Sequence, residues 1–218
     1  MSNWKYALYL GVALAVGLSA REYVRAIVAG RLGDPTPKRW GRVSLNPKTF
    51  ADPFGTVILP GLILLLWAAG GAFRPPPFAY AKPLPLDPTY LKNRDRDWTL
   101  IALSGPLTNL AIGVIAGLVL RARVAGSSID LFFLVEAFLY ANLILFVFHL
   151  MPIPGLDGAR ILARFLPPRA REVYTNLDQY LVLFILVIFF LLGGPLLNIV
   201  DGLRHGICDL VAGSLNCR

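Results

Sequence analysis

The sequence has few of the residues that most metal and nucleophilic sites require. It contains two histidines, His149 and His205, and two cysteines, Cys208 and Cys217, both near the C-terminus. The cysteines lack metal-type spacing with any group of histidines, and few conventional metal sites can be built from so small a set. Phosphate-binding loops, Ser–His–Asp or Cys–His arrangements and dinucleotide fingerprints are also absent.

Charged residues are scarce as well. They make up 16% of the chain, against 56% hydrophobic residues, and the mean hydropathy is +0.62. A soluble domain contains about 45–50% apolar and about 25% charged residues, so the composition predicts an integral membrane protein. The net charge of +8 could indicate a nucleic-acid partner. Basic loops that fix the orientation of a membrane protein explain it better, so we expect a lipid bilayer and no nucleic acid.

Five apolar segments are long enough to be membrane spans, and they predict an all-α polytopic helix bundle forming one domain over residues 1–218. The second segment is interrupted by Pro60 and Gly61, so a kinked or re-entrant element is also compatible with it. The last span and a short tail occupy residues 178–218. The five segments are residues 4–30, 54–73, 98–120, 129–150 and 181–200.

Basic residues predict the orientation of these spans. With the N-terminus outside, cytoplasmic loops hold 13 basic residues and the opposite side holds 6. We therefore expect a multi-pass protein of the inner (plasma) membrane with an extracytoplasmic N-terminus and cytoplasmic basic loops. The tail cysteines would then face an oxidising compartment and could pair. Oligomeric state is not predicted.

The connections carry two further expectations. The sequence Arg42-Val-Ser-Leu-Asn46 alternates as a short cytoplasmic strand or hairpin would. Residues 74–97 contain six prolines and should be extended. Because the chain must leave the cytoplasmic side and return between residues 54 and 97, we predict that residues 74–90 re-enter as extended chain against the bundle.

The first span contains an unusual charged cluster, Arg21-Glu22-Tyr23-Val24-Arg25. Each ionisable side chain costs about 2.5 kcal/mol or more at the middle of a membrane helix, so such groups normally pair or face a wet cavity. Arg21 and Arg25 share a helix face at i and i+4, with Glu22 beside them. The strongest candidate partner is Asp157, which lies far along the chain. Snorkelling of both arginines to the cytoplasmic surface is the alternative.

Seven local patterns, in register over residues 15–165, resemble the site-2 protease family of intramembrane zinc metalloproteases. That family has His-Glu-x-x-His in its first core helix and Leu-Asp-Gly near the end of its core. Here the corresponding patterns are Arg21-Glu-Tyr-Val-Arg25, Leu32-Gly-Asp-Pro-Thr36, Leu45-Asn-Pro47, Asp52-Pro-Phe-Gly55, Ala81-Lys-Pro-Leu-Pro85, Gly105-Pro-Leu-Thr-Asn109 and His149-Leu-Met-Pro-Ile-Pro-Gly-Leu-Asp-Gly158.

The resemblance implies roles for particular residues. Glu22 matches the general base and Asp157 the third zinc ligand, but both ligand histidines are replaced, by Arg21 and Arg25. A guanidinium group has no lone pair to give a metal. His149 stands where the family has an asparagine thought to steady the substrate or oxyanion. The residues that the resemblance assigns to the substrate cleft are Lys82, Pro83, Gly105, Pro106, Asn109, Asn142 and His149.

Three functions remain open. The first is a catalytically inactive relative (a pseudoprotease), in which an Arg21/Arg25–Glu22/Asp157 ion cluster replaces zinc and the cleft binds a transmembrane partner; no cofactor is then expected. The second is an active zinc metalloprotease with an irregular site formed by Glu22, His149 and Asp157. The third is a small transporter or proton-path element using Glu22, the arginines and Glu136, an intramembrane acid without a family role.

Several of these residues also have simpler structural explanations. Glu22 can be only the counter-ion of the arginines rather than a base. His149, at a helix end, can be a hydrogen-bonded structural residue. Gly105, Pro106 and Asn109 can form a close helix contact and its hydrogen-bonded cap rather than the wall of a cleft.

Overall fold

The computed structural model describes residues 2–71, 74–122 and 128–191, together with positions 198, 202, 205–206 and 209–210. Every regular element in this described part is helical. The α-helices are α1 (Asn3–Arg31), α2 (Thr36–Arg39), α3 (Leu59–Ala69), α4 (Arg94–Arg121), α5 (Ile129–Leu150), α6 (Asp157–Ala163), α7 (Pro168–Asn176) and α8 (Leu181–Leu191). Short 3₁₀ turns are η1 (Pro47–Thr49), η3 (Pro88–Tyr90) and η4 (Leu177–Tyr180), and η2 (Pro53–Ile58) is π-helical.

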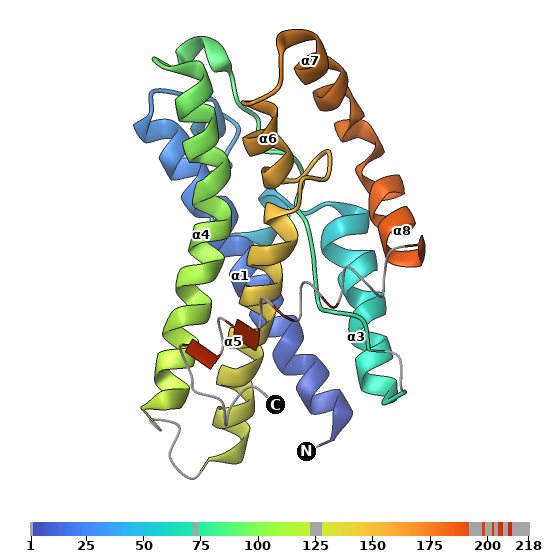
Figure 1. Ribbon diagram of the computed structural model, residues 1–218. Coiled ribbons are helices and arrows are strands. Elements are labelled where there is room, and N and C mark those ends of the chain that lie inside the picture. The colour runs from blue at the N-terminus through green and yellow to red at the C-terminus, as the bar shows by residue number, and fades with distance from the viewer. Residues whose placement is uncertain are drawn as a thin grey trace.

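Three long helices, α1, α4 and α5, pack together and form the centre of the molecule (Figure 1). Their contact faces carry small side chains: Ala13, Ala137 and Ala141 are completely buried where α1 meets α5. Gly113 of α4 faces Leu143 of α5, and a Cβ atom there would lie 3.0 Å from the leucine side chain. Small residues let helix backbones approach closely, which favours packing in an apolar solvent as well as in water.

Within the described residues, two helices, α4 and α5, are long and apolar enough to cross a membrane, and Pro53–Ala69 is a shorter apolar stretch. Helix α5 has the predicted boundaries, and α1 and α4 agree with the predicted segments to within a few residues. The predicted segment 54–73 divides into η2 and α3, which ends at Gly70 with a positive φ of 71°. The Asp52 side chain caps η2 by accepting hydrogen bonds from the Phe54 and Gly55 backbone N–H groups.

Residues 74–87 form an extended segment without helix, and Figure 1 shows this segment running along the bundle between α3 and α4. Its Phe78, Ala79 and Tyr80 are buried. The Tyr80 N–H donates to the Gly55 carbonyl, and the Lys82 N–H donates to the Phe50 carbonyl. The Thr56 hydroxyl donates to the Tyr80 carbonyl at 2.8 Å. These bonds satisfy part of the irregular backbone internally, so the segment is part of the packed structure.

Two expectations for the connections need correction. The extended chain predicted over residues 74–97 ends at residue 87, because Pro88–Tyr90 form η3 and α4 begins at Arg94. Residues 42–46 form neither a strand nor a hairpin in the described structure; the chain bends at Val43 and Leu45, and no strand lies beside it. Gly41 (φ 66°) turns the chain before this stretch, and the Asn46 side chain accepts the Lys48 N–H and so starts η1 after it. The basic stretch 158–177 contains α6 and α7, which are short and have no long apolar stripe. The fifth predicted span is helical as far as Leu191, and Cys208 and Cys217 lie outside the described residues.

Candidate functional site

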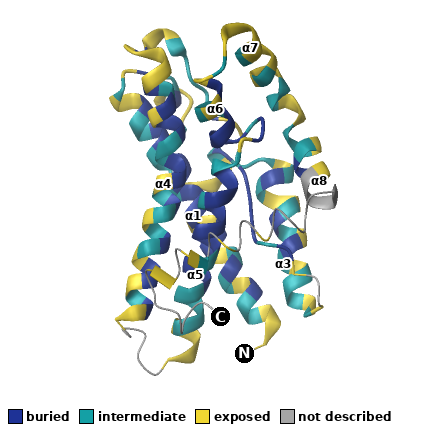
Figure 2. Ribbon diagram, viewed as in Figure 1, coloured by how far each residue is buried: buried dark blue, intermediate teal, exposed yellow. Residues whose placement is uncertain are grey.

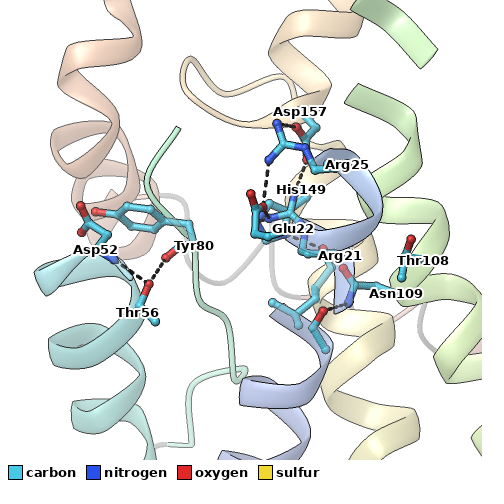
Figure 3. Close-up of polar contacts among 12 residues, drawn as sticks. Arg21, Glu22, Arg25, Asp52, Thr56, Tyr80, Thr108, Asn109, His149 and Asp157 are labelled. Atoms are coloured by element: carbon cyan, nitrogen blue, oxygen red, sulfur yellow. Dashed lines mark hydrogen bonds and ion pairs between the residues drawn. The ribbon is translucent and has the colours of Figure 1, made fainter. Parts of the chain in front are cut away.

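The charged side chains of α1 meet Asp157 in a closed ring of four ion pairs (Figure 3). One Glu22 oxygen, Oε1, lies 3.1 Å from Arg21 Nη1 and 2.9 Å from Arg25 Nη1. Asp157 Oδ2 accepts a hydrogen bond from Arg21 Nη2, and its Oδ1 lies 3.1 Å from Arg25 Nη2. Positive and negative groups alternate around the ring, and its formal charge is zero. We call these four residues the ion ring.

The ion ring is buried. Arg21 and Glu22 are each 2% exposed, Asp157 is 3% exposed and Arg25 is 5% exposed. The arginines therefore do not snorkel to the surface in this structure; they turn inward, and Figure 2 shows this part of α1 among buried neighbours. Burial raises the pKa of the Asp157 carboxyl, but the guanidinium groups of Arg25 and Arg21 outweigh it, so the pKa lies below its ordinary value.

Asp157 is presented by the turn that follows α5. Gly155 has a φ of 92°, which only glycine adopts without strain, and its N–H donates to the Asp178 carboxylate at 2.6 Å. The Tyr174 hydroxyl donates to the Pro152 carbonyl at 2.6 Å. A Cβ atom at Gly158 would overlap the Leu150 carbonyl. The α7–η4 segment thus fixes the turn that carries Asp157 into the ring.

His149 lies beside the ring and contacts Arg21. Its Nδ1 is 2.9 Å from the Leu145 carbonyl, which can only accept, so Nδ1 carries the proton. Its Nε2 is then an acceptor and lies 2.8 Å from Arg21 Nη1. This arrangement corresponds to a hydrogen-bonded structural histidine that orients a guanidinium group.

Gly105 and Pro106 lie where α4 passes the ring. A Cβ atom at Gly105 would lie 2.7 Å from Arg25 Cδ and 3.2 Å from Arg21 Nη2, so the absence of a side chain makes room for both arginines. Pro106 is buried inside α4 and has no N–H to donate. Of these two residues, Gly105 is the one that leaves space for the arginines of the ring.

Asn109, which Figure 3 shows beside the ring, forms a second, uncharged polar layer with Asn142. The Asn109 amide donates to the Gly17 carbonyl at 3.1 Å and to Asn142 Oδ1 at 3.0 Å. The Asn142 amide in turn donates to the Phe138 carbonyl at 2.9 Å. Both asparagines are completely buried, and we call them the amide layer. The layer links α1, α4 and α5, as a hydrogen-bonded helix contact does.

The other predicted positions lie apart from this centre. Lys82 is exposed on the extended segment, and the Pro83 carbonyl accepts a hydrogen bond from Arg42 at 3.2 Å. Glu136 lines a cavity of about 300 Å³ with Tyr6, Trp67 and Arg74, near the N-terminal end of α1. It stands 13 residues before His149, which is about 20 Å along α5. Glu136 is therefore not part of the same site.

Sequence reasoning missed an apolar groove of about 250 Å³ between α1 and the η1–α3 region. None of the predicted cleft residues lines it. Leu18, in its wall, is one helical turn before Arg21. Small residues on α1 and the Pro60–Gly61 step were the available sequence signals. The lining residues are Gly11, Leu14, Ala15, Leu18, Pro47, Phe50, Thr56, Val57, Pro60, Gly61, Leu64 and Ala79.

The donor set at the ring does not fit zinc. Both carboxylates are engaged by guanidinium groups, and His149 Nε2 faces Arg21 rather than a shared centre. Among the residues that the structure describes, no three His, Cys, Asp or Glu side chains come together in a group that could hold a metal ion. The guanidinium nitrogens offer no lone pair in their place.

Comparison with known proteins finds relatives by sequence. The chain is 33% identical to YwhC of Bacillus subtilis over 190 residues, which cover 83% of this chain and 80% of that protein. It is 30% identical to Rip2 of Mycolicibacterium smegmatis over 197 residues, which cover 87% of this chain and 71% of that protein. Each relative is named "Putative zinc metalloprotease".

Rip2 of Mycobacterium tuberculosis is 30% identical over 183 residues, which cover 84% of this chain and 66% of that protein. No family model matches the sequence, and no solved structure matches it. The sequence identity and the shared length in YwhC are sufficient to assign the family. The chain belongs to the family of these zinc-metalloprotease relatives, the site-2 protease family.

Proposed function

We propose that this protein is a catalytically inactive member of the site-2 protease family that binds the transmembrane segment of a partner protein. The observation that carries the proposal is the ion ring. Arg21 and Arg25 stand at the positions of the two ligand histidines of the family motif, and both bind the carboxylates of Glu22 and Asp157. In this proposal, the ion ring replaces the zinc centre of active family members.

Charge balance supports this proposal. A divalent zinc ion beside two carboxylates and two neutral histidines gives a neutral centre, and two guanidinium groups supply the same +2. Arginine binds carboxylates through several directed N–H donors and stays charged when buried. Loss of zinc alone would leave two carboxylates buried without compensation, at a cost of several kcal/mol each. The two arginines remove that cost and join α1 to the turn before α6.

The apolar groove supports partner binding. It lies one turn along α1 from the ion ring and has an apolar lining drawn from α1, the η1–α3 region and the extended segment. An apolar helix of a partner matches this lining in polarity, and small residues such as Gly11 and Ala15 permit close approach. The partner segment would lie beside the site without meeting any hydrolytic group.

The proposed setting is the inner membrane, with about five spans and an extracytoplasmic N-terminus. The two candidate spans α4 and α5, together with the relatives, support a membrane location. The proposal adds α1, the η2–α3 region and α8 as further spans. In it, the extended segment 74–87 returns through the membrane covered by protein, as irregular backbone at that depth requires.

Metal content tests the inactive centre. The purified wild-type chain is expected to hold no tightly bound zinc, whereas Arg21→His/Arg25→His should gain one zinc per chain. The triple variant with Asp157→Asn should lose it again, and Arg21→Gln/Arg25→Gln is the matched control without metal ligands. One tight zinc in the wild type, abolished by Asp157→Asn, would overturn the proposal and favour an active protease with an irregular site.

Site-specific photocrosslinking in native membranes tests the groove. A photoreactive residue at Leu18 or Val57 should crosslink to the apolar span of another membrane protein, with the crosslinked residue mapped by mass spectrometry. Ile115 is the control because it is exposed on α4 and lies outside the groove. Equal crosslinking from Ile115, or crosslinks from the groove to lipid alone, would contradict partner binding there.

A further inference from the structure

The loop of residues 38–48, which includes the last two residues of α2 and the first two of η1, has an inverted pattern of exposure, with apolar side chains outward. Trp40 is 71% exposed, Leu45 is 59% exposed and Val43 is 38% exposed. Arg42 and Ser44, which alternate with Val43 and Leu45, are half-buried. On a water-facing surface the alternation would have the opposite sense, with polar side chains outward. The outward face of this loop is therefore made for an apolar environment.

Hydrogen bonds and a cation–π contact hold the loop in this orientation. Arg42 donates to the Pro83 carbonyl at 3.2 Å, which ties the loop to the extended segment. The Ser44 hydroxyl accepts the Asn46 N–H at 3.0 Å, and Asn46 then caps η1. Arg39 donates to the Tyr90 hydroxyl and its guanidinium stacks on the Tyr90 ring. The exposed apolar side chains thus belong to a loop with fixed contacts.

The positive charge of the loop indicates that it contacts an anionic surface. Residues 38–48 include Lys38, Arg39, Arg42 and Lys48 and contain no acidic residue. Lys38, Arg39 and Lys48 are exposed. Basic side chains next to an aromatic and two aliphatic side chains match the boundary of a bilayer, where apolar groups enter the acyl region and cations meet anionic headgroups.

We propose that residues 38–48 form an anchor for anionic phospholipid headgroups, in which Trp40, Val43 and Leu45 enter the membrane interface. The proposal rests on the membrane setting given above but not on the inactive centre or on a partner. The occupant is the anionic headgroup layer of the bilayer that holds the protein. A protein partner on the same face is an outcome that the experiment distinguishes.

Fluorescence of a single label in nanodiscs tests the anchor. The full-length chain with Cys208→Ser and Cys217→Ser carries an environment-sensitive fluorophore at Leu45→Cys. Nanodiscs contain phosphatidylcholine alone or with phosphatidylglycerol, and brominated acyl chains serve as quencher. We expect blue-shifted emission and quenching that increase with phosphatidylglycerol. The control label at Lys92→Cys, an exposed polar position on the turn before α4, should keep an aqueous spectrum.

Charge removal sharpens the test. Lys38→Gln and Lys48→Gln should each reduce the preference for phosphatidylglycerol by up to about fivefold, while Lys92→Gln should leave the emission of the Leu45 label unchanged. An aqueous spectrum in both lipids, equal burial in both lipids, or protection seen only with a copurified protein would overturn the proposal. The zinc and crosslinking experiments test residues outside 38–48, so they can fail while the anchor experiment succeeds, and the reverse also holds.

Discussion

The molecule contains the same chemical contact in two environments. Arg25 Nη1 lies 2.9 Å from Glu22 Oε1 in the buried ion ring, and Arg171 Nη1 lies 2.9 Å from Asp95 Oδ1 at the surface. The side chains of the first pair are 6% and 2% exposed, and those of the second are 34% and 54% exposed. Distance alone therefore does not rank the two contacts.

The difference lies in what remains when one partner is removed. Water and salt solvate a charge that is left behind at the surface, and exposed ion pairs contribute about 0–1 kcal/mol. A charge left inside the ion ring has no such replacement, and breaking a buried pair costs about 3–5 kcal/mol. The contribution of the ring to stability therefore depends on all four members being present, and not on the strength of any one bond.

The largest effect is expected from Asp157→Ala, which leaves both guanidinium groups with Glu22 alone. Unfolding of the purified protein should show a loss of about 3–5 kcal/mol. Replacing the whole ring, with Arg21→Met, Glu22→Leu, Arg25→Met and Asp157→Leu, should cost far less because no unpaired charge remains. Equal losses in the single and quadruple variants would refute the interdependence of the four residues.

A smaller effect is expected from Gly105→Ala, which changes no charge. The new methyl group would press on Arg25 Cδ, and overpacking of this kind costs about 2 kcal/mol. Gly61→Ala is the control, because a Cβ atom there meets nothing within 4 Å and alanine is favoured in a helix. The measurement is again unfolding, and a neutral Gly105→Ala would show that the arginine side chains have free space.

The amide layer should respond less than the ring. Asn109→Leu removes the donor to Gly17 and Asn142, so that Asn142 Oδ1 stays buried without this donor while the Gly17 carbonyl keeps its bond within α1, for an expected loss of about 1–2 kcal/mol. A loss as large as that of Asp157→Ala would mean that formal charge is not what separates the two layers. Thermal unfolding of both variants in the same detergent makes the comparison.

The smallest effect is expected from Asp95→Ala at the surface pair. Stability should fall by less than about 1 kcal/mol, and the difference from wild type should shrink further at high salt. Unfolding at low and high ionic strength measures it. The cost of Asp157→Ala should change little with salt because the ring is buried; a similar salt dependence at both sites would indicate that water reaches the ring.

Much of the fold and the centre of the site could be predicted from the sequence. Long apolar segments predicted α1, α4 and α5, and prolines predicted extended chain over residues 74–97, of which residues 74–87 are extended, because these signals are local. The meeting of Arg21, Arg25 and Asp157 followed from the cost of burying unpaired charge in an apolar helix. The roles of these residues in function stay predictions.

Other features depended on contacts that no local pattern encodes. The alternation in residues 42–46 was real, but it gives a bent loop bound to Pro83 rather than a hairpin, since no second strand lies beside it in the described part of the chain. Helices α6 and α7 are too short to leave a periodic apolar signal. The apolar groove and the role of Gly105 beside the arginines arise only when distant segments pack.

The ion ring also affects the order in which the helices reach their final positions during synthesis. Arg21 is made 136 positions before Asp157, and until then the ring members present in α1 are two guanidinium groups and a single carboxylate. In the proposed membrane setting, a nascent helix with that surplus charge is costly to hold among lipids. The first helix of the chain is thus among the last to reach its final place, after the turn beyond α5 has left the ribosome.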